Sequence, residues 1–276
     1  MSEAPAPSPA ALAELACAVA VEAGELLRSR HGEVRVVQTK SSPTDVVTQM
    51  DRAAEDLIRG RILAARPGDA ILGEEGGQPE AVGAGGVRWV VDPLDGTVNY
   101  LYGLPDWSVS IAAELDGTVV AGAVSVPERQ RLFSARLGGG AWETAADAEP
   151  TALACSSRVV LADALVGTGF GYFAARRAVQ GRVVAAVLPL VRDIRRGGSA
   201  AVELCSVAAG HLDAFYERGL NPWDVAAGGL IAREAGAQVG GLHGRPASDS
   251  MAIAAGPGLF SALHDLLAGL DPERDD

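Results

Sequence analysis

The chain has 276 residues, a mass of 28.2 kDa and a formal net charge of −12. This charge argues against nonspecific binding to nucleic acids or to an anionic membrane surface, and no apolar run is long enough for a transmembrane helix. Hydrophobic residues make up 48% of the chain, enough for one large domain or two closely packed subdomains. The three cysteines, Cys17, Cys155 and Cys205, are too widely spaced to indicate a disulfide framework or a zinc site, and we expect small buried side chains.

The N-terminal part predicts a leader followed by two helices. Residues 1–9 are rich in Ala and Pro and lack a signal pattern, so we expect a disordered leader and a cytoplasmic protein. Ser8-Pro9 is typical of an N-cap and the first residue of a helix, and apolar residues then recur at helical spacing as far as Leu27. A second helix is predicted over about 48–64, before Arg66-Pro67-Gly68-Asp69.

Two short apolar runs each deliver acids into a glycine-containing turn. The runs 70–72 and 87–91 read as buried strands, and they are followed by Gly73-Glu74-Glu75-Gly76-Gly77 and by Asp92-Pro93-Leu94-Asp95-Gly96-Thr97. Carboxylates are the ligands that Mg²⁺ prefers, and glycine lets a phosphate approach backbone N–H groups. Taken singly, either segment is also ordinary turn chemistry or a solvated acidic loop.

The middle and end of the chain predict a meander and then an α/β alternation. Strands are expected at 108–114, 119–125 and 131–135, with Asp116-Gly117 as the first turn and a surface excursion from Gly138 to Pro150. Strands at 164–167 and 212–216 then alternate with helices at about 174–188, 199–209 and 258–267. This pattern predicts stacked sheet and helix layers in two subdomains, 10–150 and 151–276.

A third acidic segment lies far downstream, at Pro222-Trp223-Asp224. Pro and Asp suit the start of a helix, here predicted over 222–235 and closed by Gly236, so capping alone would also explain Asp224. Three segments nevertheless place a carboxylate at the end of an apolar element, which is how a multi-carboxylate metal site is assembled. None of the four histidines lies in a motif, so the ligand chemistry favours Mg²⁺ over Zn²⁺.

These motifs together resemble the inositol monophosphatase family. The resemblance rests on Glu74-Glu75 after Gly73, on the 92–97 segment and on Trp223-Asp224-Val225-Ala226-Ala227-Gly228. Lys40 to Asp45 with Thr48 to Asp51 looks like the mobile active-site loop of that family, and Gly198-Ser199-Ala200-Ala201 and Tyr216-Glu217 fall where it has substrate-pocket segments. The match runs in order from about Ala10 to Leu270 and implies an α/β fold, the five-layered αβαβα sandwich.

The resemblance also implies the roles of individual residues. Two to three Mg²⁺ per subunit would be held, the first by Glu74, Asp92 and the carbonyl of Leu94, the second by Asp92, Asp95 and Asp224, and a weaker third near Glu74 and the 40–45 loop. Glu74 and Thr97, with Asp51 orienting Thr97, would position and deprotonate the attacking water. Substrate contacts would come from Asp95, Gly96, Thr97, Ser199, Ala200, Glu217 and Asp224. Glu75 is equally well explained as a support of these ligands or as a solvated loop residue.

The implied activity is a Mg²⁺-dependent phosphomonoesterase that hydrolyses myo-inositol 1-phosphate by metal-activated water, an inositol-phosphate phosphatase of the EC 3.1.3.25 type. Histidinol phosphate is an alternative, since its ammonium can pair with Glu217, and so is a broad range of sugar and polyol phosphates. An alternative of another class is a non-catalytic partner of transcription or ribosomal RNA machinery, as in some bacterial relatives of the family. Inhibition by Li⁺ and a homodimer are implied by the resemblance alone, and no membrane or nucleic-acid partner is expected.

Overall fold

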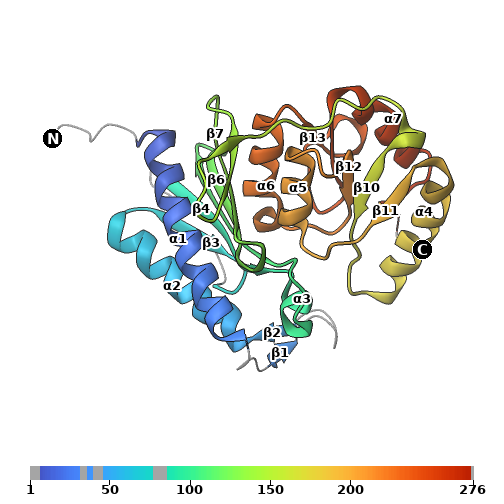
Figure 1. Ribbon diagram of the computed structural model, residues 1–276. Coiled ribbons are helices and arrows are strands. Elements are labelled where there is room, and N and C mark those ends of the chain that lie inside the picture. Colours follow the sequence, from blue (N-terminus) through green and yellow to red (C-terminus); the bar gives the residue numbers. More distant parts are fainter. Residues whose placement is uncertain (1–6, 32–35, 40–45, 77–85, 275–276) are drawn as a thin grey trace.

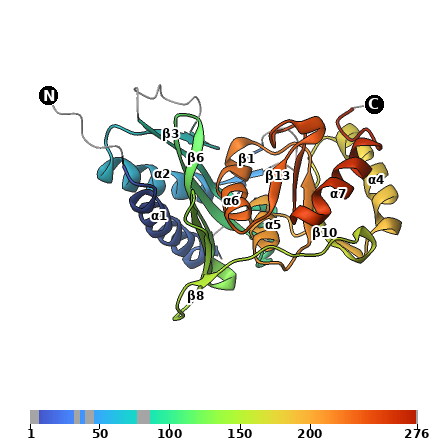
Figure 2. The same cartoon turned by 90° about the horizontal axis from the view of Figure 1, so that it is seen from above.

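The chain folds into five alternating layers of helices and sheets (Figure 1). The computed structural model describes residues 7–31, 36–39, 46–76 and 86–274. Helices α1 (Pro9–Ser29) and α2 (Gln49–Ala65) cover the outer face of a seven-stranded sheet, and α5 (Ala200–Ala208) and α6 (Pro222–Glu234) cover its inner face. A five-stranded sheet follows, with α4 (Ala174–Val187) and α7 (Pro257–Ala268) outside it. The αβαβα sandwich expected from the resemblance is therefore confirmed, and Figure 2 shows the same layers from above.

The first helices begin where their capping residues predict. The side chain of Ser8 accepts a hydrogen bond from the backbone N–H of Ala11, and Pro9 is the first helical residue. Most of the predicted leader lies outside the described residues. Thr48 and Asp51 form a capping box at the start of α2, so this part of the expected active-site loop belongs to a helix terminus. No helix in the described part of the chain combines the length and the apolarity needed to cross a membrane.

The seven-stranded sheet contains the three strands of the predicted meander, the two predicted strands β3 and β4, and two further strands, β8 and β9. Its order is β3-β4-β5-β6-β7-β8-β9, and the strands are β3 (Ala70–Gly73), β4 (Val87–Asp95), β5 (Ser108–Leu115), β6 (Thr118–Val126), β7 (Arg131–Arg136), β8 (Ala141–Ala145) and β9 (Thr151–Ala152). Asp116 and Gly117 join β5 to β6 with φ of 47° and 78°, as a two-residue hairpin requires. The surface excursion predicted for 138–150 is wrong, because β8 pairs with β7 and continues the sheet edge.

The five-stranded sheet has the order β11-β10-β12-β14-β13. Its strands are β10 (Leu165–Thr168), β11 (Asp193–Arg195), β12 (Ala214–Glu217), β13 (Gln238–Gly240) and β14 (Ala252–Ala255). Strands β10 to β12 are parallel and β13 and β14 are antiparallel. The sequence did not predict β11, β13 and β14, since three or four residues are too few to show a period. The remaining elements are β1 (Val36–Thr39), β2 (Val46–Thr48), α3 (Thr97–Tyr102) and the 3₁₀ turns Pro127–Arg129, Leu161–Asp163, Leu188–Leu190 and Leu242–Gly244.

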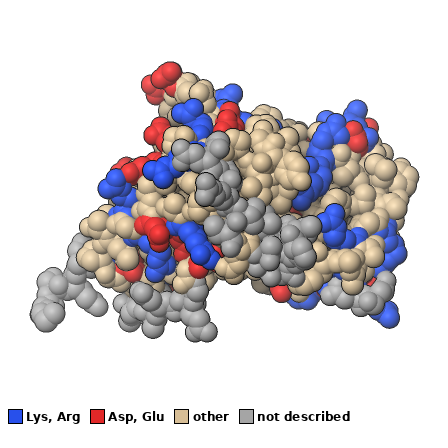
Figure 3. Space-filling model, turned by 90° about the horizontal axis from the view of Figure 1, so that it is seen from below, with Lys and Arg blue, Asp and Glu red and all other residues tan. Residues whose placement is uncertain are grey.

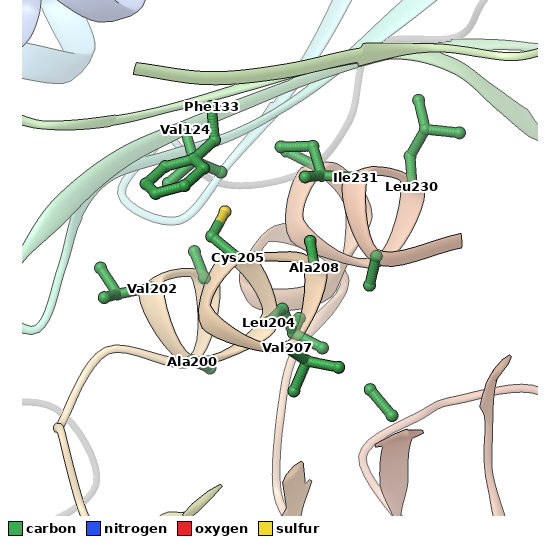
Figure 4. Packing of buried hydrophobic residues seen from close by; sticks show 14 of the residues in the cluster. Val124, Phe133, Ala200, Val202, Leu204, Cys205, Val207, Ala208, Leu230 and Ile231 are labelled. Carbon is green, nitrogen blue, oxygen red and sulfur yellow. The ribbon is translucent and has the colours of Figure 1, made fainter. Parts of the chain in front are cut away.

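Apolar side chains fill the space between the layers, and α5 is buried on both sides. Figure 4 shows Cys205 pointing toward Val124 and Phe133 of the first sheet, while Leu204 and Val207 point toward the second. Such a helix is apolar all round. The three cysteines are free, and Cys205 is fully buried, whereas Cys17 and Cys155 are half-buried.

Helix α6 lies unusually close to the first sheet, because glycine occupies the contact. A Cβ atom placed on Gly122 of β6 would lie 3.0 Å from the Cα of Ala227 in α6. This close approach brings the N-terminus of α6, with Asp224, near the end of β4. The glycine therefore links the packing of the layers to the position of a predicted site residue.

We expect Gly122→Val to lower the free energy of unfolding by about 1–3 kcal/mol, because an overpacked interface must open. Gly60→Ala is the matched control: Gly60 is exposed in the middle of α2 and nothing lies within 4 Å of its Cβ position, so this change should stabilise by about 0.5–1 kcal/mol. Urea unfolding measures both. Equal stability of Gly122→Val and the parent would contradict the close-packing argument.

Candidate active site

Three carboxylates from two distant segments converge at the end of the first sheet. Ligand oxygens of Asp92, Asp95 and Asp224 all lie within 4.8 Å of one another. Strand β4, expected to end at Val91, continues to Asp95, and its pairing with β5 shifts register between Asp92 and Asp95. Residues three apart on a regular strand point to opposite faces. The extra residue of this bulge, next to Pro93, lets both aspartates reach the same place.

The start of α5 holds Asp95. The Oδ2 atom of Asp95 accepts hydrogen bonds from the Ser199 hydroxyl at 2.6 Å and from the Ala201 N–H at 2.7 Å. Ser199 is the N-cap of α5, is only 1% exposed, and also accepts a hydrogen bond from the Val202 N–H. Ser199 was expected to contact substrate; its hydroxyl bonds Asp95 and the helix terminus, and the cleft lining does not include it, so this contact stays a prediction.

Asp224 both caps a helix and lines the cleft, the two possibilities that the sequence left open. It is the third residue of α6, and its carboxylate accepts a hydrogen bond from the Asn221 N–H at 2.7 Å in a capping box. The same side chain lines the cleft with Asp92 and Asp95. Helix capping thus fixes the orientation of the acid rather than competing with a role at the site.

Asp51, Thr97 and Leu94 form a second group beside the carboxylates. The Thr97 hydroxyl lies 3.1 Å from Asp51 Oδ1 and 3.1 Å from the Leu94 carbonyl oxygen, and it can donate to either. Asp51 Oδ2 accepts from the backbone N–H and the hydroxyl of Thr48 at 2.8 and 2.5 Å. Burial raises the pKa of Asp51 to about 6, so this carboxyl is ionised at neutral pH and accepts these hydrogen bonds.

The carboxylates line a cleft with a volume of about 460 Å³. The cleft lies between the half of the molecule that contains the first sheet and the half that contains the second. Its lining includes these predicted residues: Glu74, Asp92, Leu94, Asp95, Gly96, Thr97, Ala200, Glu217 and Asp224. Gly96 bends the chain with a φ of 91°, which glycine adopts without strain. Lys40 to Asp45, and with them the surroundings of the expected third metal, lie outside the described residues.

Glu217 lies at the end of β12, under Gly169. A Cβ atom on Gly169 would overlap the Glu217 carboxyl group, so only glycine fits there. Burial, followed by the charges of Asp224 and Asp95, raises the pKa of Glu217 to about 8. Glu217 is therefore linked electrostatically to the carboxylate cluster although it comes from the second sheet.

The sequence analysis missed the cationic and aromatic part of the lining. Arg176, Arg196 and Arg218 come from three separate segments, and Phe170, Tyr172 and Phe173 follow β10. In Figure 3, which shows the molecule from below, Lys and Arg side chains outnumber Asp and Glu side chains on the right half of the view. Of the adjacent residues Arg195 and Arg196, Arg195 forms an ion pair with Asp193 and only Arg196 lines the cleft. The other site residues lie in segments that follow strands. The segment after β10 could therefore have been predicted to line the cleft as well.

The donor set fits a hard cation. Burial and the charges of neighbouring acids raise the pKa of Asp92 and of Asp224 well above the ordinary value. Buried like charges are costly unless a cation compensates them. Every ligand atom of the cluster is an oxygen, as Mg²⁺, Ca²⁺ and Mn²⁺ prefer.

The layers and the buried carboxylate cluster define a metal-dependent phosphatase. Residues 8–271 match the Inositol monophosphatase family, and the chain belongs to this family. It is 46% identical over 286 aligned residues to the Inositol-1-monophosphatase SuhB of Mycobacterium tuberculosis, covering 97% of this chain and 98% of the relative. The solved structure of Mycobacterium tuberculosis SuhB has a TM-score of 0.83 and 43% identity, covering 97% of this chain and 99% of that one.

A further relative has a name of another kind. The chain is 38% identical over 243 residues to the Nus factor SuhB of Pseudomonas aeruginosa, covering 83% of this chain and 85% of the relative. The family and its phosphatase members establish the chain as a phosphoric monoester hydrolase.

Glu203 of α5 holds the loop that leads into the site. Its Oε1 atom accepts a hydrogen bond from the Gly197 N–H at 2.6 Å, and its side chain is 5% exposed. Burial raises its pKa to about 7, from 4.5. The folded state therefore binds a proton at Glu203 more tightly than the unfolded state does. The free energy of unfolding that this group contributes is lost as the pH rises from about 4.5 through 7.

We expect Glu203→Gln to remove this loss, since the amide oxygen still accepts from Gly197 without carrying a charge. Relative to the parent, the variant should gain up to about 3 kcal/mol at pH 8 and little at pH 4.5. Urea unfolding in EDTA at both pH values measures it, with the exposed Glu149→Gln as control. If the variant and the parent differ in free energy of unfolding by the same amount at both pH values, Glu203 does not have a raised pKa in the folded state.

Proposed function

We propose that the chain is a Mg²⁺-dependent phosphatase that hydrolyses myo-inositol 1-phosphate to inositol and phosphate. One observation carries the proposal: Asp92, Asp95 and Asp224 converge within 4.8 Å in a cleft that also contains Glu74, Thr97 and Glu217. The cleft is large enough for a small phosphorylated polyol. Relatives named inositol-1-monophosphatase support the same substrate.

The proposed metal ligands come from the ends of β3 and β4 and from the first turn of α6. Glu74, Asp92 and the Leu94 carbonyl would hold one Mg²⁺, and Asp92, Asp95 and Asp224 would hold a second. When bound, Mg²⁺ neutralises these acids, polarises the phosphate and lowers the pKa of water. Leu94 lies next to the cluster, since its N–H donates to Asp92 Oδ1 at 3.0 Å.

The attacking water would be positioned by Thr97 and deprotonated by Glu74. The Asp51 carboxylate draws the Thr97 hydroxyl proton away from the cleft, so the hydroxyl oxygen faces a water as an acceptor. Such positioning, with little covalent chemistry by the protein, is typical of phosphoryl transfer. Gly96 and Thr97, whose backbone lines the cleft at the start of α3, would contact the phosphate.

The alcohol half of the substrate would contact Asp95, Ala200, Glu217 and Asp224, and Ser199 would act through Asp95. Acidic groups are good acceptors for the hydroxyls of a polyol. The ammonium group of histidinol phosphate would also suit Glu217, and broader use of sugar phosphates remains an alternative within the same site. The homodimer, the Li⁺ sensitivity and the cytoplasmic location stay predictions from the sequence.

Asp92→Asn tests the metal site. Because Asp92 is proposed to contact both metals, its loss should remove several kcal/mol of transition-state stabilisation, a decrease in kcat of at least about 10³-fold. The measurement is phosphate release from myo-inositol 1-phosphate at saturating Mg²⁺. Asp69→Asn, a buried acid away from the cleft, is the control. Turnover by Asp92→Asn within a few-fold of the parent would exclude the proposed ligand set.

Glu217→Gln tests the substrate. We expect kcat/KM for myo-inositol 1-phosphate to fall by about 2- to 10-fold, since the amide replaces one acceptor oxygen of Glu217 by an NH₂ donor and the lost hydrogen bond contributes ~0.5–1.5 kcal/mol. Glycerol 2-phosphate, which lacks the ring hydroxyls, should be affected little. The comparison includes histidinol phosphate and fructose 1,6-bisphosphate. If histidinol phosphate is the best substrate and loses most in the variant, Glu217 is an ammonium partner and the proposed substrate is incorrect.

The relative named Nus factor SuhB supports a second candidate function, a partner in transcription or ribosomal RNA machinery. A net charge of −12 argues that any such role works through protein contacts. Affinity purification of the Asp92→Asn variant separates the functions. Recovery of RNA polymerase or ribosomal RNA factors by this inactive variant would show a role that does not need the phosphatase site.

A further inference from the structure

Helix α2 presents two buried carboxylates on one face, and the proposed mechanism uses only the first. Asp51 and Glu55 are four residues apart, so they lie one turn apart on the same side of the helix. They are 1% and 2% exposed. Asp51 accepts a hydrogen bond from Thr97. Glu55 reaches the loop that follows β3, where the proposed ligand Glu74 lies.

The backbone from Gly73 to Gly76 wraps around the Glu55 carboxylate. Its Oε2 atom accepts a hydrogen bond from the Glu75 N–H at 2.8 Å. A Cβ atom on Gly73 would lie 2.6 Å from the Glu55 carboxyl carbon, and one on Gly76 would overlap Oε1. The two glycines therefore leave the space that the carboxylate fills, and no larger residue fits on either side of Glu74-Glu75 without moving it.

A second backbone hydrogen bond connects Glu74 to strand β4. The Glu74 N–H donates to the carbonyl of Val91 on β4 at 3.2 Å, and the next N–H, that of Glu75, donates to Glu55. Successive amides are thus anchored on a strand and on a helix. Of the two adjacent glutamates, Glu74 lines the cleft and Glu75 is absent from its lining.

We infer that Glu55 is a positioning residue that selects Glu74, rather than Glu75, as the acid facing the metal site. The inference rests on the proposed function, because it concerns the metal ligand Glu74. Helix α2 then has two roles at the site, since one of its carboxylates orients the hydroxyl of Thr97 and the next orients the backbone that carries Glu74.

A purely structural role explains the arrangement less well. Within the described residues, Glu55 Oε1 accepts no hydrogen bond, and its nearest cation, Arg59 Nη1, lies 3.9 Å away. A buried carboxylate oxygen without a hydrogen bond is costly for stability. Its position is accounted for if the shape of this side chain and its acceptor oxygen are needed to hold the loop.

Binding of Mg²⁺ alone, measured by calorimetry without substrate, tests the inference on four variants of the full chain. Glu55→Ala should weaken Mg²⁺ affinity by about 10–100-fold, as for partners that orient a metal ligand. Glu55→Gln retains an oxygen that can accept from Glu75, so it should bind more like the parent. Gly76→Ala leaves Glu55 intact but displaces the loop, and should also weaken binding.

Asp69→Asn is the matched control. Asp69 is a buried acid at the opposite end of β3, where it accepts a hydrogen bond from Trp89 Nε1 at 2.8 Å. This variant should lose stability in urea and keep the Mg²⁺ affinity of the parent. Hydrogen exchange provides a readout without metal: the amide of Glu75 should exchange faster in Glu55→Ala and not in Asp69→Asn.

Parent-like Mg²⁺ affinity in Glu55→Ala and Gly76→Ala would overturn the inference, and so would equal weakening by Asp69→Asn. If Glu55→Ala does not fold, Gly76→Ala and Glu55→Gln decide the matter. A parent chain that binds no Mg²⁺ would overturn the proposed metal site itself, and this inference with it. Since the assay contains no substrate, an error about which ester is hydrolysed does not affect the outcome.

Discussion

Mutual repulsion among buried carboxylates is the constraint on which the rest of the site depends. Asp92, Asp95 and Asp224 lie within 4.8 Å of one another, and each accepts a hydrogen bond from a backbone N–H group: Leu94 for Asp92, Ala201 for Asp95 and Asn221 for Asp224. Two of these donors belong to the first turns of α5 and α6, where N–H groups need acceptors. The inner helices therefore begin at the carboxylates.

A helix on the outer face of the first sheet also holds site residues through hydrogen bonds. Helix α2 supplies Asp51 to Thr97 and Glu55 to the Glu74-Glu75 backbone, so helices on opposite faces of one sheet fix groups that meet at its edge. Apolar packing sets the distances, as in the contact of Gly122 with Ala227. Catalytic geometry in this protein is thus a consequence of how tightly α2 and α6 pack on β3, β4 and β6.

The region of the second sheet contributes a different set of side chains to the cleft. Glu217 at the end of β12, the aromatic residues after β10 and three arginines line the same cleft as the three aspartates. In the proposed function, the acids of the first sheet would hold the metal beside the phosphate, and this mixed lining would contact the alcohol half of the substrate. Within a chain of net charge −12, local arginines and a bound cation are what would attract an anionic substrate.

The sequence alone determined the elements with long periodic patterns, α1, α2 and the β5–β7 meander, because amphipathic periods and caps act locally. It also identified Glu74, Asp92, Asp95 and Asp224, since acids at the ends of apolar runs stand out. Tertiary structure decided the rest. The bulge at Pro93 brings Asp92 and Asp95 to one face, Ser199 donates to Asp95, and Arg176, Arg196 and Arg218 meet from distant segments. Strands such as β13 and β14 form only because neighbours pair with them. These features depend on contacts between residues far apart in the chain, which no local pattern records.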